Sequence, residues 1–200
     1  MEAGLTVRTI SIIALLCEVS VAGFAQYAEP LDVDGKLRYH VKKTFGPSAL
    51  ALSGVKAGFL LMKDGSSEWG QGMNGYGKRS ASSIGSSAMR GMLAFGLDTA
   101  LHQDPRYFRS VNTGFFRRTG HALRGIVVTR TDKGGETLAT WRLGSAYGAA
   151  FISNQWYPDR LNTTRRGFKD GSARLGFDFV KNMTAEFWPD IKMKIKRRKT

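Results

Sequence analysis

Cysteine and histidine are scarce in this chain of 200 residues. Cys17 is the one cysteine, and the three histidines are His40, His102 and His121. A single thiol cannot close an intramolecular disulfide, so the fold has to be held together by packing. No pair of histidines has a metal-binding spacing such as H-x-x-x-H. We therefore expect no disulfide, no metal site and no bound cofactor.

The N-terminus also lacks an apolar run long enough for a clear membrane-spanning helix. Its short run, from Ile10 to Leu16, follows Arg8 and leads to small residues at 20–25. A charged start, a short apolar run and a small-residue cleavage site are typical of a secretory signal peptide. We predict a signal peptide over residues 1–25 and an exported mature protein. An uncleaved anchor and a soluble helix are the alternatives.

Acidic residues are few, 16 against 30 lysines and arginines, and the formal net charge is +14. For an exported protein, the common anionic partner is a lipid or lipopolysaccharide surface, and nucleic acid is disfavoured. Near a bilayer, each cation can add about 1 kcal/mol of attraction to anionic headgroups. A solvated tail is the other interpretation, and another envelope protein or a second copy of the chain are alternative partners. Six cations fall in the last nine residues: Lys192, Lys194, Lys196, Arg197, Arg198 and Lys199.

Established catalytic motifs are missing as well. There is no G-x-S-x-G motif and no Walker loop, and "GQGMNG" at 70–75 matches G-x-G-x-x-G without a strand before it. One polar cluster remains, formed by His102, Asp104, Arg106 and Arg109, with Arg118 and His121 further along. A histidine beside an aspartate can act as an oriented general base, so His102, Asp104 and His121 are weak catalytic candidates. We favour a structural role, in which Asp104 caps a helix and the arginines pair with carboxylates or lipid phosphates.

Turn-forming residues divide the rest of the chain. Residues 26–36 are polar and predict a linker. The segment "KLRYHVKKTFG" (36–46) fits a helix or a strand and ends at Gly46-Pro47. Residues 48–62 favour a buried or interfacial helix. Ser66 and Ser67 with Glu68 resemble a helix start, so we expect one long helix from there to His102. The predicted domains are a signal peptide (1–25), a linker (26–36), a helical domain (37–191) and a basic tail (192–200).

Proline is rare, and three of the five prolines lie in similar contexts, at 103–108, 156–161 and 187–192. The residue before a proline avoids helical angles, so each context predicts a boundary between helices. An aspartate beside the proline favours the start of the next helix.

Residues 125–144 break the helical pattern. Val127, Val128 and Thr129 favour a strand, and the turn formers at 132–135 permit a β-hairpin. A loop that ends one helix and leads to another starting at Glu136 fits the same residues. We favour the loop.

Small residues recur at helical spacing in a chain with 24 glycines. Such rows allow another helix to approach closely, and glycine inside a helix otherwise costs about 0.5–1 kcal/mol relative to alanine. Arg90 and Asp98 fall in the most apolar part of this region and argue against a clean membrane span. We expect a compact helical assembly against a membrane, packed through Gly77, Ala81 and Gly85, through Ser83, Ser87 and Gly91, and through Gly144 and Gly148.

Longer motifs connect the chain with known sequences. They are "EWGQGMNGYGKR" (68–79), "LHQDPRYFR" (101–109), "RTGHAL" (118–123), "VTRTDKGGET" (128–137), "ISNQWYP" (152–158) and "DFVKNMTAEFWPDI" (178–191). In these motifs the chain resembles a family of uncharacterised secreted bacterial envelope proteins. The resemblance covers most of residues 37–191 and implies export and a shared fold, with no known activity. "NQWYPDR" differs from the family pattern, which has a longer insertion after this proline.

We therefore predict an all-α, glycine-rich helical bundle with Pro-Asp corners and at most one short β-hairpin near 125–144. A small outer-membrane β-barrel, acting as a channel, is the alternative fold, although convincing alternation occurs only near 125–144 and 191–195. The expected function is that of an envelope-associated structural or interaction protein in the periplasm or outer membrane. A periplasmic enzyme that uses residues 102–121 is the further alternative.

Overall fold

The computed structural model describes residues 29–47, 49–50, 72–157 and 162–197. This part of the chain contains five helices and one hairpin, which confirms the all-α prediction with a short hairpin. The expected signal peptide, most of the helix expected over 48–62 and the helix start at 66–68 lie outside the described residues. The elements are α2 (Val33–Phe45), α4 (Gly72–Ala100), α5 (Phe115–Val127), β1 (Val128–Arg130), β2 (Glu136–Leu138), α6 (Thr140–Asn154) and α7 (Thr164–Arg197).

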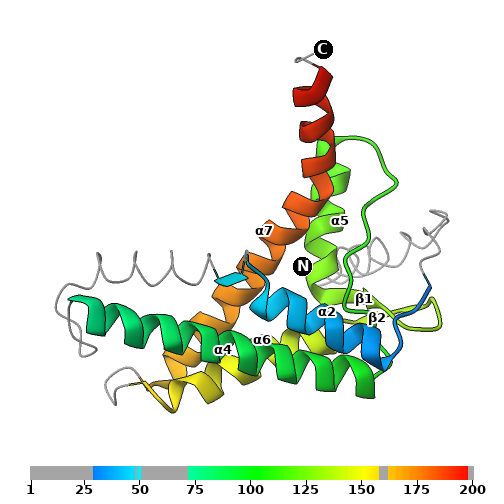
Figure 1. The fold of residues 1–200 in the computed structure, drawn as a ribbon. Helices are drawn as coiled ribbons and strands as arrows, with labels where there is room; N and C mark the ends of the chain where they lie inside the picture. The colour runs from blue at the N-terminus through cyan, green and yellow to red at the C-terminus, as the bar shows by residue number, and fades with distance from the viewer. Residues whose placement is uncertain (1–28, 48, 51–71, 158–161, 198–200) are drawn as a thin grey trace, which may run out of the picture.

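Helix α6 lies at the centre of the fold. Helices α4 and α7 both pack against it, α2 lies against α4, and α5 lies against α7 (Figure 1). The C-terminal end of α7, red in Figure 1, projects away from α4 and α6 with α5 beside it. The hairpin connects the end of α5 to the start of α6.

Helix α2 begins earlier than the sequence predicts. The Asp32 side chain caps it by accepting a hydrogen bond from the Gly35 N–H at 2.7 Å. Asp34 in the first turn and Lys43 in the last both suit the helix dipole. Residues 33–36 are therefore helical, and the prediction that the linker extends to residue 36 is wrong. Gly46, in extended conformation, ends the helix.

Two residues after α4 ends at Ala100, His102 adopts a left-handed conformation with a φ of 51°. The next N–H, that of Gln103, donates to the Asp98 carbonyl at 2.8 Å, as in a Schellman motif. The Gln103 side chain then donates to the Leu138 carbonyl (2.8 Å) and accepts from the Trp141 N–H (3.2 Å). One glutamine thereby ties the end of α4 to the hairpin and to the start of α6.

Residues 128–138 form an antiparallel hairpin, so our preference for a loop is wrong. The Thr131 N–H donates to the Gly135 carbonyl at 2.8 Å and closes the turn. Gly134 has a φ of 85°, a conformation that glycine adopts without strain. The helix expected to start at Glu136 begins at Thr140 instead. The paired residues are Val128 with Leu138, Thr129 with Thr137 and Arg130 with Glu136.

The three proline contexts have different outcomes. The boundary at 103–108 is confirmed, although the next helix starts only at Phe115. The context at 156–161 lies largely outside the described residues. The corner expected at 187–192 is wrong, because α7 continues through Pro189 to Arg197. Proline lacks an N–H and interrupts the helical ladder there, but Arg109 donates to the nearby Glu186 carbonyl at 2.9 Å and supports this turn.

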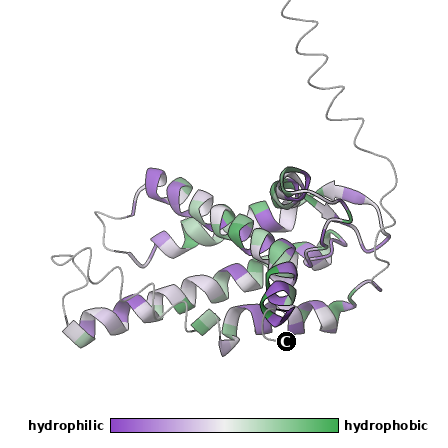
Figure 2. Cartoon of the chain, turned by 90° about the horizontal axis from the view of Figure 1, so that it is seen from above, coloured by the Kyte–Doolittle hydropathy of each residue, from purple (hydrophilic) through white to green (hydrophobic). Residues whose placement is uncertain are grey.

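The interior is built from small and polar side chains rather than large apolar ones. Alanines and Trp141 supply most of the buried apolar residues, and the polar or charged residues buried with them are more numerous. Many large apolar side chains lie on the outside, and hydrophilic and hydrophobic residues are interleaved along the helices in Figure 2. The largest side chains that are less than 2% exposed include Glu186, Asn154 and Asp98.

Candidate functional site

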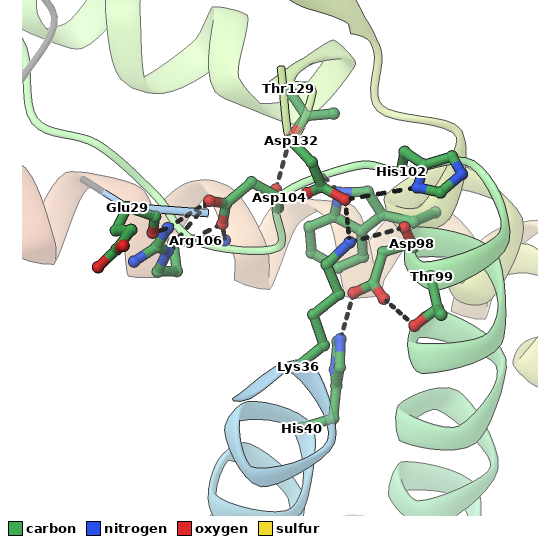
Figure 3. Close-up of polar contacts among 11 residues, drawn as sticks. Glu29, Lys36, His40, Asp98, Thr99, His102, Asp104, Arg106, Thr129 and Asp132 are labelled. Carbon is green, nitrogen blue, oxygen red and sulfur yellow. Dashed lines mark hydrogen bonds and ion pairs between the residues drawn. The ribbon is translucent and has the colours of Figure 1, made fainter. Parts of the chain in front are cut away.

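A first group of buried charges joins α2 to the end of α4. The His40 Nε2 lies 2.5 Å from an Asp98 carboxylate oxygen, and Asp98 is 0% exposed. Lys36, one turn earlier on α2, donates to the Asp98 carbonyl (3.1 Å) and to the Asp132 carboxylate (2.8 Å). Figure 3 shows these side chains converging beside the hairpin. The inward face of α2 is therefore its charged face.

A second group surrounds Asp178 on α7. Arg90 of α4 binds this carboxylate with both terminal nitrogens, and the Arg142 NH1 of α6 lies 4.0 Å from it. Burial raises the pKa of Asp178, but the charges of Arg90, Arg142 and Lys43 outweigh this effect and hold its pKa below the usual value. Burial lowers the pKa of Lys43 to about 8. Its Nζ lies 5.1 Å from the centre of the Tyr39 ring.

A third group surrounds Glu186, which is 0% exposed on α7. Its carboxylate accepts from the Arg118 Nε (2.9 Å), the Tyr107 hydroxyl (2.9 Å) and the Ser110 N–H (3.1 Å). Burial raises its pKa, and these hydrogen bonds together with the Arg118 charge bring the pKa below its usual value. Arg118 also binds Asp190 at 2.5 Å, so α5 is tied to α7 by ion pairs.

The weak catalytic candidates do not form a catalytic arrangement. His102 is 80% exposed in its side chain, and its Nδ1 lies 3.8 Å from Asp132. Asp104 is occupied by Arg106, which donates to it from Nε (3.0 Å) and from the terminal nitrogen (2.6 Å). The helix-capping role expected of Asp104 is wrong, because its side chain accepts from the Arg106 N–H in an extended segment. The His121 Nε2 donates to the carbonyl of residue 108 at 3.0 Å.

The outward face of the C-terminal part of α7 carries exposed apolar residues on both sides of Thr184. We call Phe177, Val180, Trp188, Ile191 and Ile195 the α7 row; each is between 46% and 58% exposed. At 100° per residue, these five positions fall within about 80° of one another. The buried residues Asp178, Asn182 and Glu186 lie on the other side of the helix. The helix therefore turns polar residues inward and apolar residues outward.

Helix α2 has the same inverted arrangement. Val33, Leu37, Val41 and Phe45, the α2 row, follow one another at four-residue spacing and are 44–58% exposed. Lys36 and His40, on the adjoining face that meets α4, are 2% and 4% exposed. No hydrophobic interior receives either row within the described part of the chain.

The last turns of α7 combine apolar and basic residues. We call Lys192, Lys194, Lys196 and Arg197 the basic end; all four are exposed. Arg198 and Lys199 lie outside the described residues. Lys192 and Lys194 border the α7 row on its two sides at helical spacing. Phe115 of α5, 59% exposed, lies against α7 before the basic end, with its ring centre 5.4 Å from that of Phe187.

The small residues divide into packed and unpacked groups. A Cβ on Gly144 would lie 2.8 Å from a Leu97 methyl, and one on Gly148 would lie 3.2 Å from a Leu93 methyl, so α4 and α6 approach closely there. Gly91 faces Thr44 of α2.

The other row expected to pack lies on the surface. Gly77, Ala81 and Gly85 are exposed, and no described atom lies within 4 Å of a Cβ placed on Gly77 or Gly85. Ser83 and Ser87 are partly exposed, and the Ser87 hydroxyl bonds its own helix at the Ser83 carbonyl (2.9 Å). The contact expected of Gly77, Ala81 and Gly85 is thus not made by any residue that the structure describes.

Sequence reasoning missed the buried residues Asp178, Asn182 and Glu186. Their four-residue spacing opposite an apolar row was visible in the sequence, but a polar row is ordinarily assigned to the solvent side of a helix. In the ranges that the structure covers, no group of side chains is suited to hold a metal ion, and no helix is long and apolar enough to cross a membrane. No protein-family model, curated protein or solved structure matches the chain.

Proposed function

We propose that this protein is an exported, envelope-associated structural or interaction protein that binds the surface of an anionic lipid bilayer through α7. The α7 row would enter the boundary between headgroups and acyl chains, and the basic end would contact lipid phosphates. The observation that carries the proposal is the exposed apolar row, bordered by lysines, on a helix whose opposite face is polar and buried.

The dimensions of the α7 row suit this role. Phe177 and Ile195 are separated by 18 positions, which correspond to about 27 Å of helix. A helix with an apolar face and basic flanks lies in the plane of the interface, with its apolar face buried by about 5–10 Å. Trp188 near the basic end is a residue type enriched at this depth. The row is thus long enough to anchor the protein along one helix.

Charge favours a lipid surface over an apolar protein partner. The acidic residues near the end of α7, Glu186 and Asp190, are neutralised by Arg118 and Arg109. The exposed cations of the basic end lie beside the row and past its last residue. At about 1 kcal/mol per cation near an anionic bilayer, they would add several kcal/mol of attraction.

Two features of the sequence support the envelope as the location. The N-terminal pattern of residues 1–25 is typical of a secretory signal peptide. The motifs at 101–109 and 178–191 belong to the resemblance with secreted envelope proteins. Export and an envelope location are therefore part of the function that we propose.

Flotation with lipid vesicles tests the proposal. The chain should float with vesicles that contain phosphatidylglycerol and less with vesicles of phosphatidylcholine alone. Fully burying a large apolar side chain contributes about 1.5–3 kcal/mol, so replacing Trp188 and Ile191 together by serine should weaken binding at least tenfold. Replacing Met73, which is 82% exposed on α4, by serine is the matched control and should leave binding unchanged.

Two results would contradict this function. One is equal flotation of the Trp188→Ser, Ile191→Ser variant and the parent chain. The other is a loss of self-association, measured by sedimentation, without any loss of vesicle binding. The second result would assign the α7 row to a contact between copies of the chain.

A further inference from the structure

A small cavity lies between the extended segment 106–108, α5 and the hairpin. Its volume is about 60 Å³. A water molecule occupies about 30 Å³ in the liquid, so the cavity has the size of two waters or one small oxyanion. Its walls are strongly basic: they include Arg106, Arg124, Arg130, Arg142 and His121, with Glu136 as the one carboxylate.

Arg106 and Arg124 are each held by a carboxylate beside the cavity. Arg106 is bound by Asp104, with three side-chain hydrogen bonds of 2.6–3.1 Å. Arg124 is held by both oxygens of Glu136, at 2.8 and 2.7 Å. The pKa of Glu136 is accordingly lowered, mainly by the hydrogen bond from Arg124. The carboxylates nearest the cavity are therefore already paired.

Arg142 is a buried guanidinium that shares its one nearby carboxylate with Arg90 and lies 4.6 Å over the centre of the Trp141 ring. Its side chain is 4% exposed, and its nearest carboxylate, Asp178, lies 4.0 Å away and is bound by Arg90. The buried Arg142 Nε has no hydrogen-bond partner among the described residues. A buried donor without an acceptor destabilises the fold, and more strongly when the group is charged. Burial lowers the pKa of Arg142.

The other walls would hold an anion in place. The Arg130 guanidinium lies 4.2 Å above the Phe108 ring, which fixes its plane. Since His121 Nε2 donates to the Phe108 carbonyl, its position at the wall is also fixed. Arginine is the side chain best suited to bind the oxygens of phosphate or carboxylate through parallel N–H groups.

We infer that this cavity is a binding site for a small oxyanion of the phosphate class, with Arg142 at its buried side and Arg130 at its wall. The site shares no residue with the α7 row, so it does not rest on the proposed function. A free phosphate ion and the phosphate of a small glycerol ester present the same chemistry, and the test below separates them.

Calorimetric titration of the chain with inorganic phosphate, in a buffer free of other oxyanions, tests the inference. We expect saturable binding at one site, and the variant Arg142→Gln should bind about tenfold to a hundredfold more weakly because a charge-assisted hydrogen bond is lost. Arg174→Gln is the matched control, because Arg174 is another arginine whose pKa is lowered by burial but lies outside the cavity. It should bind phosphate like the parent chain. A parallel titration with glycerol 3-phosphate identifies the source: tighter binding than phosphate indicates an ester, and weaker binding indicates the free ion.

A second variant keeps the test decisive if Arg142→Gln does not fold. Arg130→Gln removes charge from the wall of the cavity, where the side chain is only partly buried. It should weaken phosphate binding and reduce the rise in melting temperature that phosphate produces. The inference is overturned if the folded chain shows no saturable binding at up to about 10 mM phosphate, tenfold above a weak dissociation constant of about 1 mM. Equal binding by the parent chain and either folded cavity variant would overturn it as well.

Discussion

Asp178 is a buried carboxylate that faces two arginines from other helices. It is 2% exposed, and Arg90 and Arg142 approach it from α4 and α6. Burying an ion costs several kcal/mol, which a close partner offsets only when the geometry is good. An exposed pair such as Arg38 with Asp34 contributes about 0–1 kcal/mol. Buried ion pairs therefore link residues of different helices in this protein. Removing one residue of such a pair leaves the charge of its partner buried and unpaired.

Lys43 gives this coupling a measurable pH dependence. Its pKa is about 8 in the folded chain, mainly because of burial, against an ordinary value of 10.5. Between pH 8 and about 10, the unfolded chain keeps the proton that the folded chain has released, so the free energy of unfolding should rise with pH. The rise is at most about 1.4 kcal/mol per pH unit for one proton. Above pH 10 the trend should reverse, because burial raises the pKa of Tyr39 to about 12 and the folded chain then holds the extra proton.

Urea denaturation at pH 8, 9 and 10 measures this slope. The variant Lys43→Met should lose most of the rise and keep only the part due to Lys181, whose pKa is also lowered by burial. Lys42→Met, an exposed neighbour in the same turn, should keep the full rise. An unchanged slope in Lys43→Met would assign the dependence to another group.

Helices in this fold meet through small residues on α6 and α7. Gly167 faces the Phe151 ring, with a Cβ position 2.5 Å from a ring carbon, and Gly171 faces the Tyr147 ring still more closely. Both glycines lie on the buried face of α7. Side chains there would separate α7 from α6 and disturb the charged groups between them. The spacing of α6 and α7 thus depends on these positions.

Alanine substitutions at two glycines should have opposite effects on the melting temperature. Gly171→Ala places a Cβ into the Tyr147 ring, and overpacking of this kind typically costs about 1–3 kcal/mol. Gly85→Ala meets open space on α4 and should stabilise by about 0.5–1 kcal/mol, because alanine favours the helix. Thermal unfolding followed by circular dichroism compares the two variants. A loss of stability in Gly85→Ala would indicate that the row of Gly77 and Gly85 does pack.

The whole molecule combines a charged interior with two apolar outer rows. Its net charge is +14, and four exposed cations lie where α7 ends, beyond the ion pairs that tie α5 to α7. A lipid surface would cover the α7 row and meet the positive charge at the same time. Attraction of this kind weakens with ionic strength, because the Debye length falls from about 10 Å at 0.1 M to about 3 Å at 1 M salt.

Binding to anionic vesicles should depend more on the cations of the basic end than on the net charge of the whole chain. Replacing Lys192, Lys194, Lys196 and Arg197 by glutamine keeps the α7 row and removes up to about 4 kcal/mol of attraction. Binding to phosphatidylglycerol vesicles should weaken and lose most of its salt dependence in a flotation series from low to high salt. The control variant carries the same number of neutralised, exposed cations on other elements, at Lys42, Lys133, Arg165 and Lys169. If both variants weaken binding equally, the basic end has no special role.

Local chemistry in the sequence determined where several helices exist and where they stop. Glycine, proline and capping residues act on their own neighbours, so the boundary at 103–108 and the long helix before it were predictable. The hairpin was not, because residues 128–138 have ambiguous local preferences and contacts with Gln103 contribute to the outcome. The continuation of α7 through Pro189 was not predictable either, because Arg109 and Arg118 from outside the helix support the interrupted turn.

The direction in which each helix faces was decided by tertiary structure alone. A polar row such as Asp178, Asn182 and Glu186 is ordinarily placed toward solvent, and here it faces inward. It can do so only because cations far away in the chain meet it: Arg90 and Asp178 are separated by 88 positions, and Arg118 and Glu186 by 68. No local pattern encodes such a pairing, since the free energy that makes a buried carboxylate tolerable comes from the partner and is present only once the helices have packed.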